Sequence, residues 1–500
     1  MRMQQDKEKR RFTVTNRFAT GTNTAGTNTT PAPVQAQSRP LARDQKMHPA
    51  HQLAFGGLYL FTLLLYVRPN ELFPEVLGTF PIPRIVAVIA IVAYIGGMLG
   101  SGHRLTIVPI ELKLLAFIAA LGVLFAPLAS SPSDSVDMLL DMFIKVIIIF
   151  ILMINVINTH HRLRLMLSLV VVCGTIFAAL AIKSFVVGDF TVVEKKDVGV
   201  VGLRIVGAVG GFFGNPNDLA TSLNLLLPLA VALALTNKGL KRLLYLACGV
   251  VLIGGVIVTF SRGGFLGLAS LGAVFLCKAG RHNRGMAALA LAAILGVFVL
   301  AMPMGYGGRI SSIFGNDPTG SNDTRRDLLE RAVSIAAHHP IIGIGMGNFH
   351  IYSIHEQVAH NSYLEISSEL GLAGLGAYLL VIFAPLWSLR RIERETLVQE
   401  QGPLIYRNSK RYIERDIHYF SIALQAVLVA YIVCSFFGSI QYQWFLYYPV
   451  AYAIVLRRIH LARQESRAAT PQQSTGKARG VIWGDGPNAA PAGAIARVRT

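Results

Sequence analysis

The chain has 500 residues, of which 53% are hydrophobic and only 15% are charged, and its formal net charge is +19. Apolar runs of about 16–24 residues recur from Gln52 to Leu456, which is the length that a helix needs to cross a bilayer. The runs show no period-2 alternation, so we expect an all-α integral membrane protein rather than a soluble protein or a β-barrel.

The chain divides into a membrane domain between two polar tails. Residues 1–50 are basic and then rich in Thr, Asn, Ala and Pro, which predicts a disordered tail, and residues 461–500 have a similar composition. The membrane domain, residues 51–460, contains a large loop at residues 305–364, between the ninth and tenth predicted helices. About twelve membrane helices are predicted, at residues 52–67, 85–100, 107–127, 136–157, 164–187, 217–236, 241–260, 263–279, 286–304, 365–388, 418–437 and 442–457.

The basic residues predict the orientation of the chain. Lys and Arg gather in the even-numbered linkers, whereas the linkers near Ser130 and Gln441 contain none. The positive-inside rule therefore places both termini in the cytoplasm, and the linkers 188–216, 260–263 and 305–364 on the external side. Topology also accounts for the net charge, and no basic-aromatic surface motif accompanies it, so we expect no nucleic-acid partner.

Topology gives no reason for the external arginines, which makes them candidate site residues. Arg262 stands at the start of a predicted helix between Ser261 and Gly263, where free backbone N–H groups and the helix dipole suit a phosphate. The alternative is an arginine that snorkels to the interface. Arg204 precedes a glycine-rich entry into a helix that carries Asn217 in its first turn; the alternative is an ordinary loop cation.

Two further arginines begin an amphipathic helix predicted over residues 324–339. Its apolar stripe predicts that the helix lies on the membrane or on the bundle, and comprises Leu328, Leu329, Ala332, Ile335 and Ala336. Arg325 lies four residues before Leu329 and should point toward the buried face. Arg326 lies four residues before Glu330, which is more simply explained by a solvated ion pair.

His360 is the candidate catalytic base. It lies outside, just ahead of a predicted helix, beside Asn361 and Tyr363, and an imidazole there can accept a hydroxyl proton near neutral pH. Glu369 follows about one turn inside the apolar run, where a carboxylate is costly and usually orients a partner, with helix capping or packing as the alternative.

The external acidic residues show no metal-ligand spacing, so we expect neither a metal nor another cofactor. An arginine fork can instead neutralise the two phosphates of a diphosphate leaving group.

Together these motifs resemble the O-antigen ligase and polymerase superfamily, in order and over about residues 50–460. The resemblance is carried by Arg204 with Gly214-Asn215-Pro216-Asn217, by Ser261-Arg262-Gly263, by Arg325 ahead of the run from His339 to Gly345, and by the run from His360 to Leu364 with Glu369 and Gly371. One departure is Leu329, because relatives often carry Trp about four residues after the arginine that aligns with Arg325.

The resemblance implies a GT-C-like helical bundle that acts as a glycosyltransferase in the bacterial inner membrane. Relatives take a glycan from undecaprenyl diphosphate in the outer leaflet and join it to lipid A core, another lipid-linked repeat unit or a protein hydroxyl, without metal or nucleotide. We expect His360 to act as the base and Arg204, Arg262 and Arg325 to bind the diphosphate, and the expected supporting residues are Asn217, Asn361, Tyr363 and Glu369.

Two other functions fit the same composition. A non-enzymatic transporter or flippase of lipid-linked or anionic substrates would need charges deep inside several helices, and Asp141, Lys145 and Lys183 are candidates. A structural membrane subunit of a polysaccharide-export complex is the third possibility. The sequence does not separate a ligase from a polymerase, because the external loops shape the acceptor pocket.

Overall fold

The computed structural model describes residues 49–73, 75, 78, 80–101, 106–189, 191–194, 201–204, 215–278, 285, 321–353, 357–400 and 411–468. The ninth predicted membrane helix, at residues 286–304, and nearly all of both predicted tails lie outside these ranges. Within them nine helices are long and apolar enough to span a membrane. The prediction of an all-α, multi-span membrane protein is therefore confirmed.

The described elements follow the predicted order closely. The first half comprises α1 (Pro49–Val67), α2 (Pro69–Leu72), α4 (Ile82–Ser101), α5 (Ile110–Phe125), η1 (Ala126–Leu128), α6 (Pro132–Asp137), the π-helical turn η2 (Met138–Phe143), α7 (Ile144–Val156) and α8 (His160–Val187). Two short strands, β1 (Thr191–Glu194) and β2 (Val201–Arg204), then form an antiparallel hairpin that the sequence analysis did not predict.

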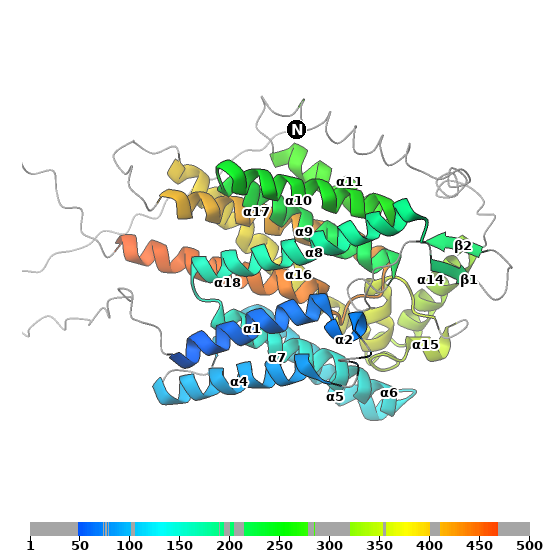
Figure 1. The fold of residues 1–500 in the computed structure, drawn as a ribbon. Helices are drawn as coiled ribbons and strands as arrows, with labels where there is room; N and C mark the ends of the chain where they lie inside the picture. Colours follow the sequence, from blue (N-terminus) through cyan, green and yellow to red (C-terminus); the bar gives the residue numbers. More distant parts are fainter. Residues whose placement is uncertain are drawn as a thin grey trace, which may run out of the picture. The chain divides into compact units, whose positions relative to one another are not determined.

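The second half contains the elements that build the candidate site (Figure 1). They are α9 (Pro216–Thr236), α10 (Gly239–Val258), α11 (Arg262–Lys278), α14 (Ser321–His338), α15 (Phe349–Tyr352), α16 (Ser362–Glu400), α17 (Arg411–Cys434), η5 (Ser435–Phe437) and α18 (Trp444–Ala468). The predicted helices at residues 263–279 and 442–457 correspond to α11 and α18, which are not among the nine helices that are long and apolar enough to span a membrane.

Helix α9 is the most buried of the candidate spans, with 89% of its most apolar 18-residue window buried. It packs against α8, α10, α11 and α17. Its neighbours present glycines to it: an added Cβ at Gly255 of α10 would lie 2.7 Å from Leu223, and one at Gly264 of α11 would lie 2.4 Å from Ala220. Small residues at these crossings let the helix backbones approach closely, as is common between membrane helices.

The bundle has two ends with different chemistry. We call the end at which α9, α11, α16 and α18 begin the site end, and the opposite end the basic end. At the basic end the guanidinium of Arg457 donates to both carboxylate oxygens of Glu111 at 2.8 and 3.0 Å. Arg164 pairs with Asp416 there, and Lys278 pairs with Glu393.

Helix α14 lies on the bundle as the sequence predicts. It packs on α16, and Leu328 and Ala332 of its apolar stripe are fully buried. They form a cluster with Phe349 and Ala359, against which Ile335 packs. Arg326 forms the expected exposed ion pair with Glu330, at 2.9 Å.

Candidate active site

His360 occupies a tight turn immediately before α16. Its φ angle is +53°, in the left-handed region that few non-glycine residues adopt. Its backbone N–H donates to Ser439 Oγ at 3.1 Å. Asn361 follows as the N-cap of α16, because its Oδ1 accepts the N–H groups of Tyr363 and Leu364 at 3.0 and 3.1 Å. The cap and the bond to Ser439 together fix the backbone that presents the imidazole.

The linker between α17 and α18 is clamped onto the first turn of α16. Ser362 Oγ donates to Gly438 O at 2.7 Å and accepts the N–H of Ile440 at 2.9 Å. The Tyr363 hydroxyl donates to Ile432 O at 3.0 Å and accepts from Ser435 Oγ at 2.8 Å. The predicted supporting residue Tyr363 thus ties α16 to the end of α17.

Arg262 begins α11 directly after a strained corner, where Phe260 has a φ angle of +49°. Ser261 caps this helix by accepting the N–H of Gly264 at 3.1 Å. The same hydroxyl donates to Asn217 Oδ1, in the first turn of α9, at 2.8 Å. The predicted supporting residue Asn217 therefore joins the starts of α9 and α11, next to Arg262.

The structure brings Arg262 and His360 to the same short linker. A Cβ added to Gly263 would lie 2.7 Å from the Cβ of Phe437, so the start of α11 packs directly on η5. Two residues further along, Ser439 holds the backbone of His360. The two predicted site residues, 98 positions apart in the sequence (360 − 262), thus flank residues 437–439.

Arg325 approaches this region from α14. Its side chain is half-buried, and it shares a helix face with the buried Leu328 three residues later. Leu328 packs with Ala359, the residue immediately before His360. The buried face of α14, beside which Arg325 lies, therefore packs next to the His360 turn, a contact that the apolar stripe alone did not predict.

Arg204 is the last residue of β2, where it pairs in register with Thr191 of β1. The described structure covers its backbone and not its side chain. Its convergence with the other two arginines stays a prediction.

Glu369 is buried and is held by neutral donors. Its Oε2 accepts from the Tyr442 hydroxyl at 2.8 Å, and its Oε1 accepts the N–H of Phe349 at 3.3 Å. Because Phe349 begins α15 and Tyr442 precedes α18, this carboxylate connects three segments. These contacts explain why a carboxylate stands inside an apolar run. They favour a role for Glu369 in holding these segments in position.

The glycine-rich loop 340–347 docks into an interruption of α16. Gly371 breaks the helix with φ +66° and ψ −171°. In a regular helix the N–H of Leu372 would donate to Ser368 O; here it donates to Pro340 O at 2.8 Å, while Ser368 O accepts the N–H of Ile344 at 2.9 Å. The loop and the helix thus exchange backbone partners, and the exchange pairs Pro340 O and Ser368 O.

Only glycine fits where this loop meets α16. Gly343 has a φ angle of +72°, and a Cβ there would lie 2.3 Å from Glu369 O. The next residue in this contact, Gly345, has a φ angle of +104° and its N–H donates to the same carbonyl at 3.0 Å. Nothing local in the run from His339 to Gly345 predicts that it packs against α16.

Sequence reasoning missed four residues that build the site: Glu365, Ser439, Gln441 and Tyr442. The last three lie in the linker without basic residues, which the sequence analysis used only for orientation. Its run of polar residues between two apolar helices was the available signal.

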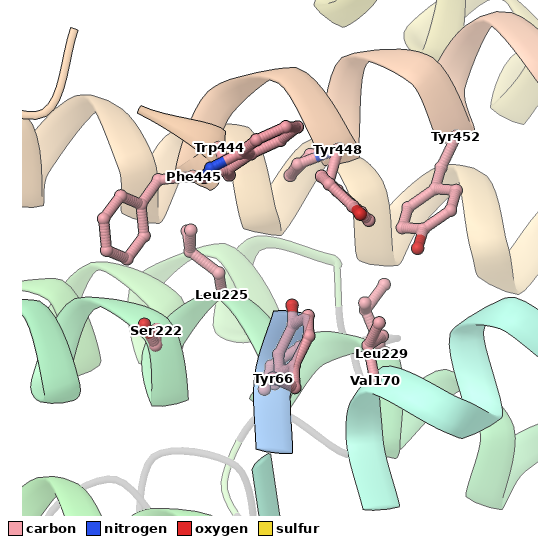
Figure 2. A pocket seen from close by; sticks show the side chains of 11 residues that line it. Tyr66, Val170, Ser222, Leu225, Leu229, Trp444, Phe445, Tyr448 and Tyr452 are labelled. Carbon is pink, nitrogen blue, oxygen red and sulfur yellow. The ribbon is translucent and has the colours of Figure 1, made fainter. Parts of the chain in front are cut away.

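The small pocket in Figure 2 lies within the bundle core, between α1, α8, α9 and α18. Its volume is about 30 Å³, room for about two water molecules and far below the roughly 300 Å³ or more of a ligand site. The buried hydroxyl of Tyr452 has no hydrogen-bond partner among the described residues. A water molecule in the pocket could satisfy it, so we assign the pocket to core packing and not to substrate.

Residues 247–379 match the family model described as O-Antigen ligase. This segment contains Arg262, Arg325 and His360. No curated protein matches the chain.

Proposed function

We propose a specific reaction at the site end of the bundle. The premise is that the chain belongs to the O-antigen ligase and polymerase superfamily. The match over residues 247–379 supports glycosyltransferase activity of the ligase or polymerase type. The specific reaction is transfer of a glycan from undecaprenyl diphosphate to an acceptor hydroxyl, on the periplasmic face of the bacterial inner membrane. The observation that carries it is the shared linker 437–439, which Arg262 and His360 flank.

The chemistry assigns a role to each group. The acceptor oxygen attacks the anomeric carbon, and its proton passes to the imidazole of His360. The bond between the anomeric carbon and the diphosphate oxygen breaks, and the electron pair leaves with the diphosphate. Arg262 and Arg325, with Arg204, stabilise that developing charge. Attack opposite the leaving group inverts the anomeric configuration.

The acceptor is lipid A core, a second lipid-linked repeat unit or a protein hydroxyl, and the donor and acceptor are the partners that the site implies. Among the described residues no group of three or more His, Cys, Asp or Glu side chains is placed to hold a metal ion.

The transporter alternative loses its main support in the structure. Asp141 and Lys145 form an exposed ion pair at 2.6 Å on the outside of the bundle. Lys183 is exposed on the outside as well. These three charges therefore do not line a path through the protein.

The test is transfer by purified protein in detergent, with a radiolabelled lipid-linked glycan donor and an acceptor extract. We expect His360→Ala to reduce product formation by about 10²–10⁴-fold, the usual contribution of a positioned base. His338→Ala is the matched control, because His338 is an exposed histidine at the end of α14. Full transfer by His360→Ala would remove the assignment of the base, and donor binding without bond formation by the wild type would favour a transporter.

A further inference from the structure

A second carboxylate lies one turn nearer to His360 than Glu369 does. Glu365 is only 5% exposed. Its Oε2 accepts the N–H of Ala359 at 2.9 Å and the hydroxyl of Ser439. Its Oε1 accepts from Gln441 Nε2 at 2.9 Å. All three partners are neutral donors, and an ionised carboxylate, which only accepts, satisfies them together.

Ser439 links Glu365 to the backbone of His360 by two hydrogen bonds. Its hydroxyl proton goes to Glu365, which leaves the oxygen to accept the N–H of His360 at 3.1 Å. Glu365 therefore holds two consecutive backbone amides, the one of Ala359 directly and the one of His360 through Ser439. These contacts join residues separated by 74 and 79 positions in the sequence.

The held turn is strained. A non-glycine residue in the left-handed region is sterically strained and keeps that conformation only when its surroundings fix it. His360 has a φ angle of +53°. Without the two amide anchors its backbone would relax toward negative φ, and the direction of the Cα–Cβ bond would change with it.

We infer that Glu365 and Ser439 are positioning residues, which hold His360 in the one backbone conformation that aims its imidazole at the acceptor. They touch neither donor nor acceptor and act through His360. The expected effect on glycan transfer rests on the proposed function, whereas the hydrogen bonds that hold the His360 backbone do not.

The first arm of the test measures geometry. Ser439→Ala removes the acceptor of the His360 N–H, and Ser439→Thr retains a hydroxyl in its place. We expect hydrogen exchange at the amides of residues 359 and 360 to accelerate roughly fivefold or more in Ser439→Ala, and to return toward the wild-type rate in Ser439→Thr. Ser367→Ala is the matched control, because among the described residues that hydroxyl bonds to Leu364 O within its own helix and not to the His360 turn.

The second arm measures transfer. We expect Ser439→Ala to lower kcat by roughly tenfold or more with little change in the donor KM, since misplacement of a catalytic group affects the reacting complex. In a His360→Ala background the same substitution should change the residual rate by less than about twofold, because it acts through His360. Glu365→Gln, which keeps the size of the side chain, should lower kcat in the same direction and serves where Ser439→Ala does not fold.

The outcomes separate the two proposals. Unchanged exchange at residues 359 and 360, or faster exchange with an unchanged kcat, would overturn the positioning role. An additive loss of transfer in the double variant with His360→Ala would overturn it as well. Wild-type protein that makes no glycosidic product would count against the proposed function, while the exchange measurements would still test the geometry.

Discussion

The two ends of the bundle use buried carboxylates in opposite ways. At the basic end Glu111, Glu393 and Asp416 are each paired with a Lys or Arg side chain. At the site end Glu365 and Glu369 accept from hydroxyl, amide and backbone N–H donors instead. Cations at the basic end are thus part of the scaffold. The carboxylates at the site end instead anchor turns through neutral donors.

The largest effect on stability should come from the basic end. Arg457→Ala leaves the fully buried carboxylate of Glu111 without its partner, which we expect to cost about 3–5 kcal/mol. Thermal unfolding in detergent measures this loss, and transfer per folded molecule should remain within about twofold of the wild type.

The double variant Arg457→Leu with Glu111→Leu checks the cause. Replacing both charges by apolar side chains should recover most of the stability, because the penalty comes from one unpaired charge. If Arg457→Ala alone unfolds at the wild-type temperature, the scaffold role of the basic end is wrong.

Arg262 should show the reverse pattern. Arg262→Ala should lower transfer by about 10²–10³-fold through lost stabilisation of the leaving diphosphate, with little change in the unfolding temperature. Arg262→Lys should restore only part of the rate, since a lysine cannot form a bidentate fork. Arg331→Lys is the control at the same end, because in the described part of the chain Arg331 is exposed and donates to the backbone carbonyl of Tyr352 in α15. A fully active Arg262→Lys variant would contradict bidentate binding.

The smallest effect is expected at Arg326, the neighbour of Arg325. It forms an exposed ion pair with Glu330 within α14, and such pairs contribute little. Arg326→Ala should change both the unfolding temperature and the transfer rate by no more than the error of measurement, whereas Arg325→Ala should lower transfer. Equal losses of transfer in the two variants would show that the position of an arginine on α14 does not decide whether it contributes to the reaction.

The helical architecture could be predicted because the apolar runs are long and the basic residues mark one set of linkers. The candidate site residues were chosen for the same reason: Arg262, Arg325 and His360 stand in linkers that the basic residues predict to be external, and each lies at or near a helix start. Their roles stay predictions. Asn215 caps α9, because its side chain accepts the N–H groups of Asn217 and Asp218.

The rest depends on contacts between distant parts of the sequence. Nothing local in Ser439 or Gln441 shows that they meet Glu365, since the partners are 74 and 76 positions away. The break of α16 at Gly371 was hidden because glycine is common in membrane helices and the apolar run continues through it. The loop that fills the break comes from an earlier segment, and only the fold shows the exchange.

That exchange fixes the spacing of the glycine-rich loop. Three backbone hydrogen bonds set this spacing. The N–H of Leu372 donates to Pro340 O, the N–H of Ile344 donates to Ser368 O, and the N–H of Gly345 donates to Glu369 O. External loops of membrane proteins commonly accept extra residues, but a single insertion or deletion between 340 and 345 would move every donor past its acceptor. The length of this loop is therefore as rigidly specified as the register of a strand in a sheet.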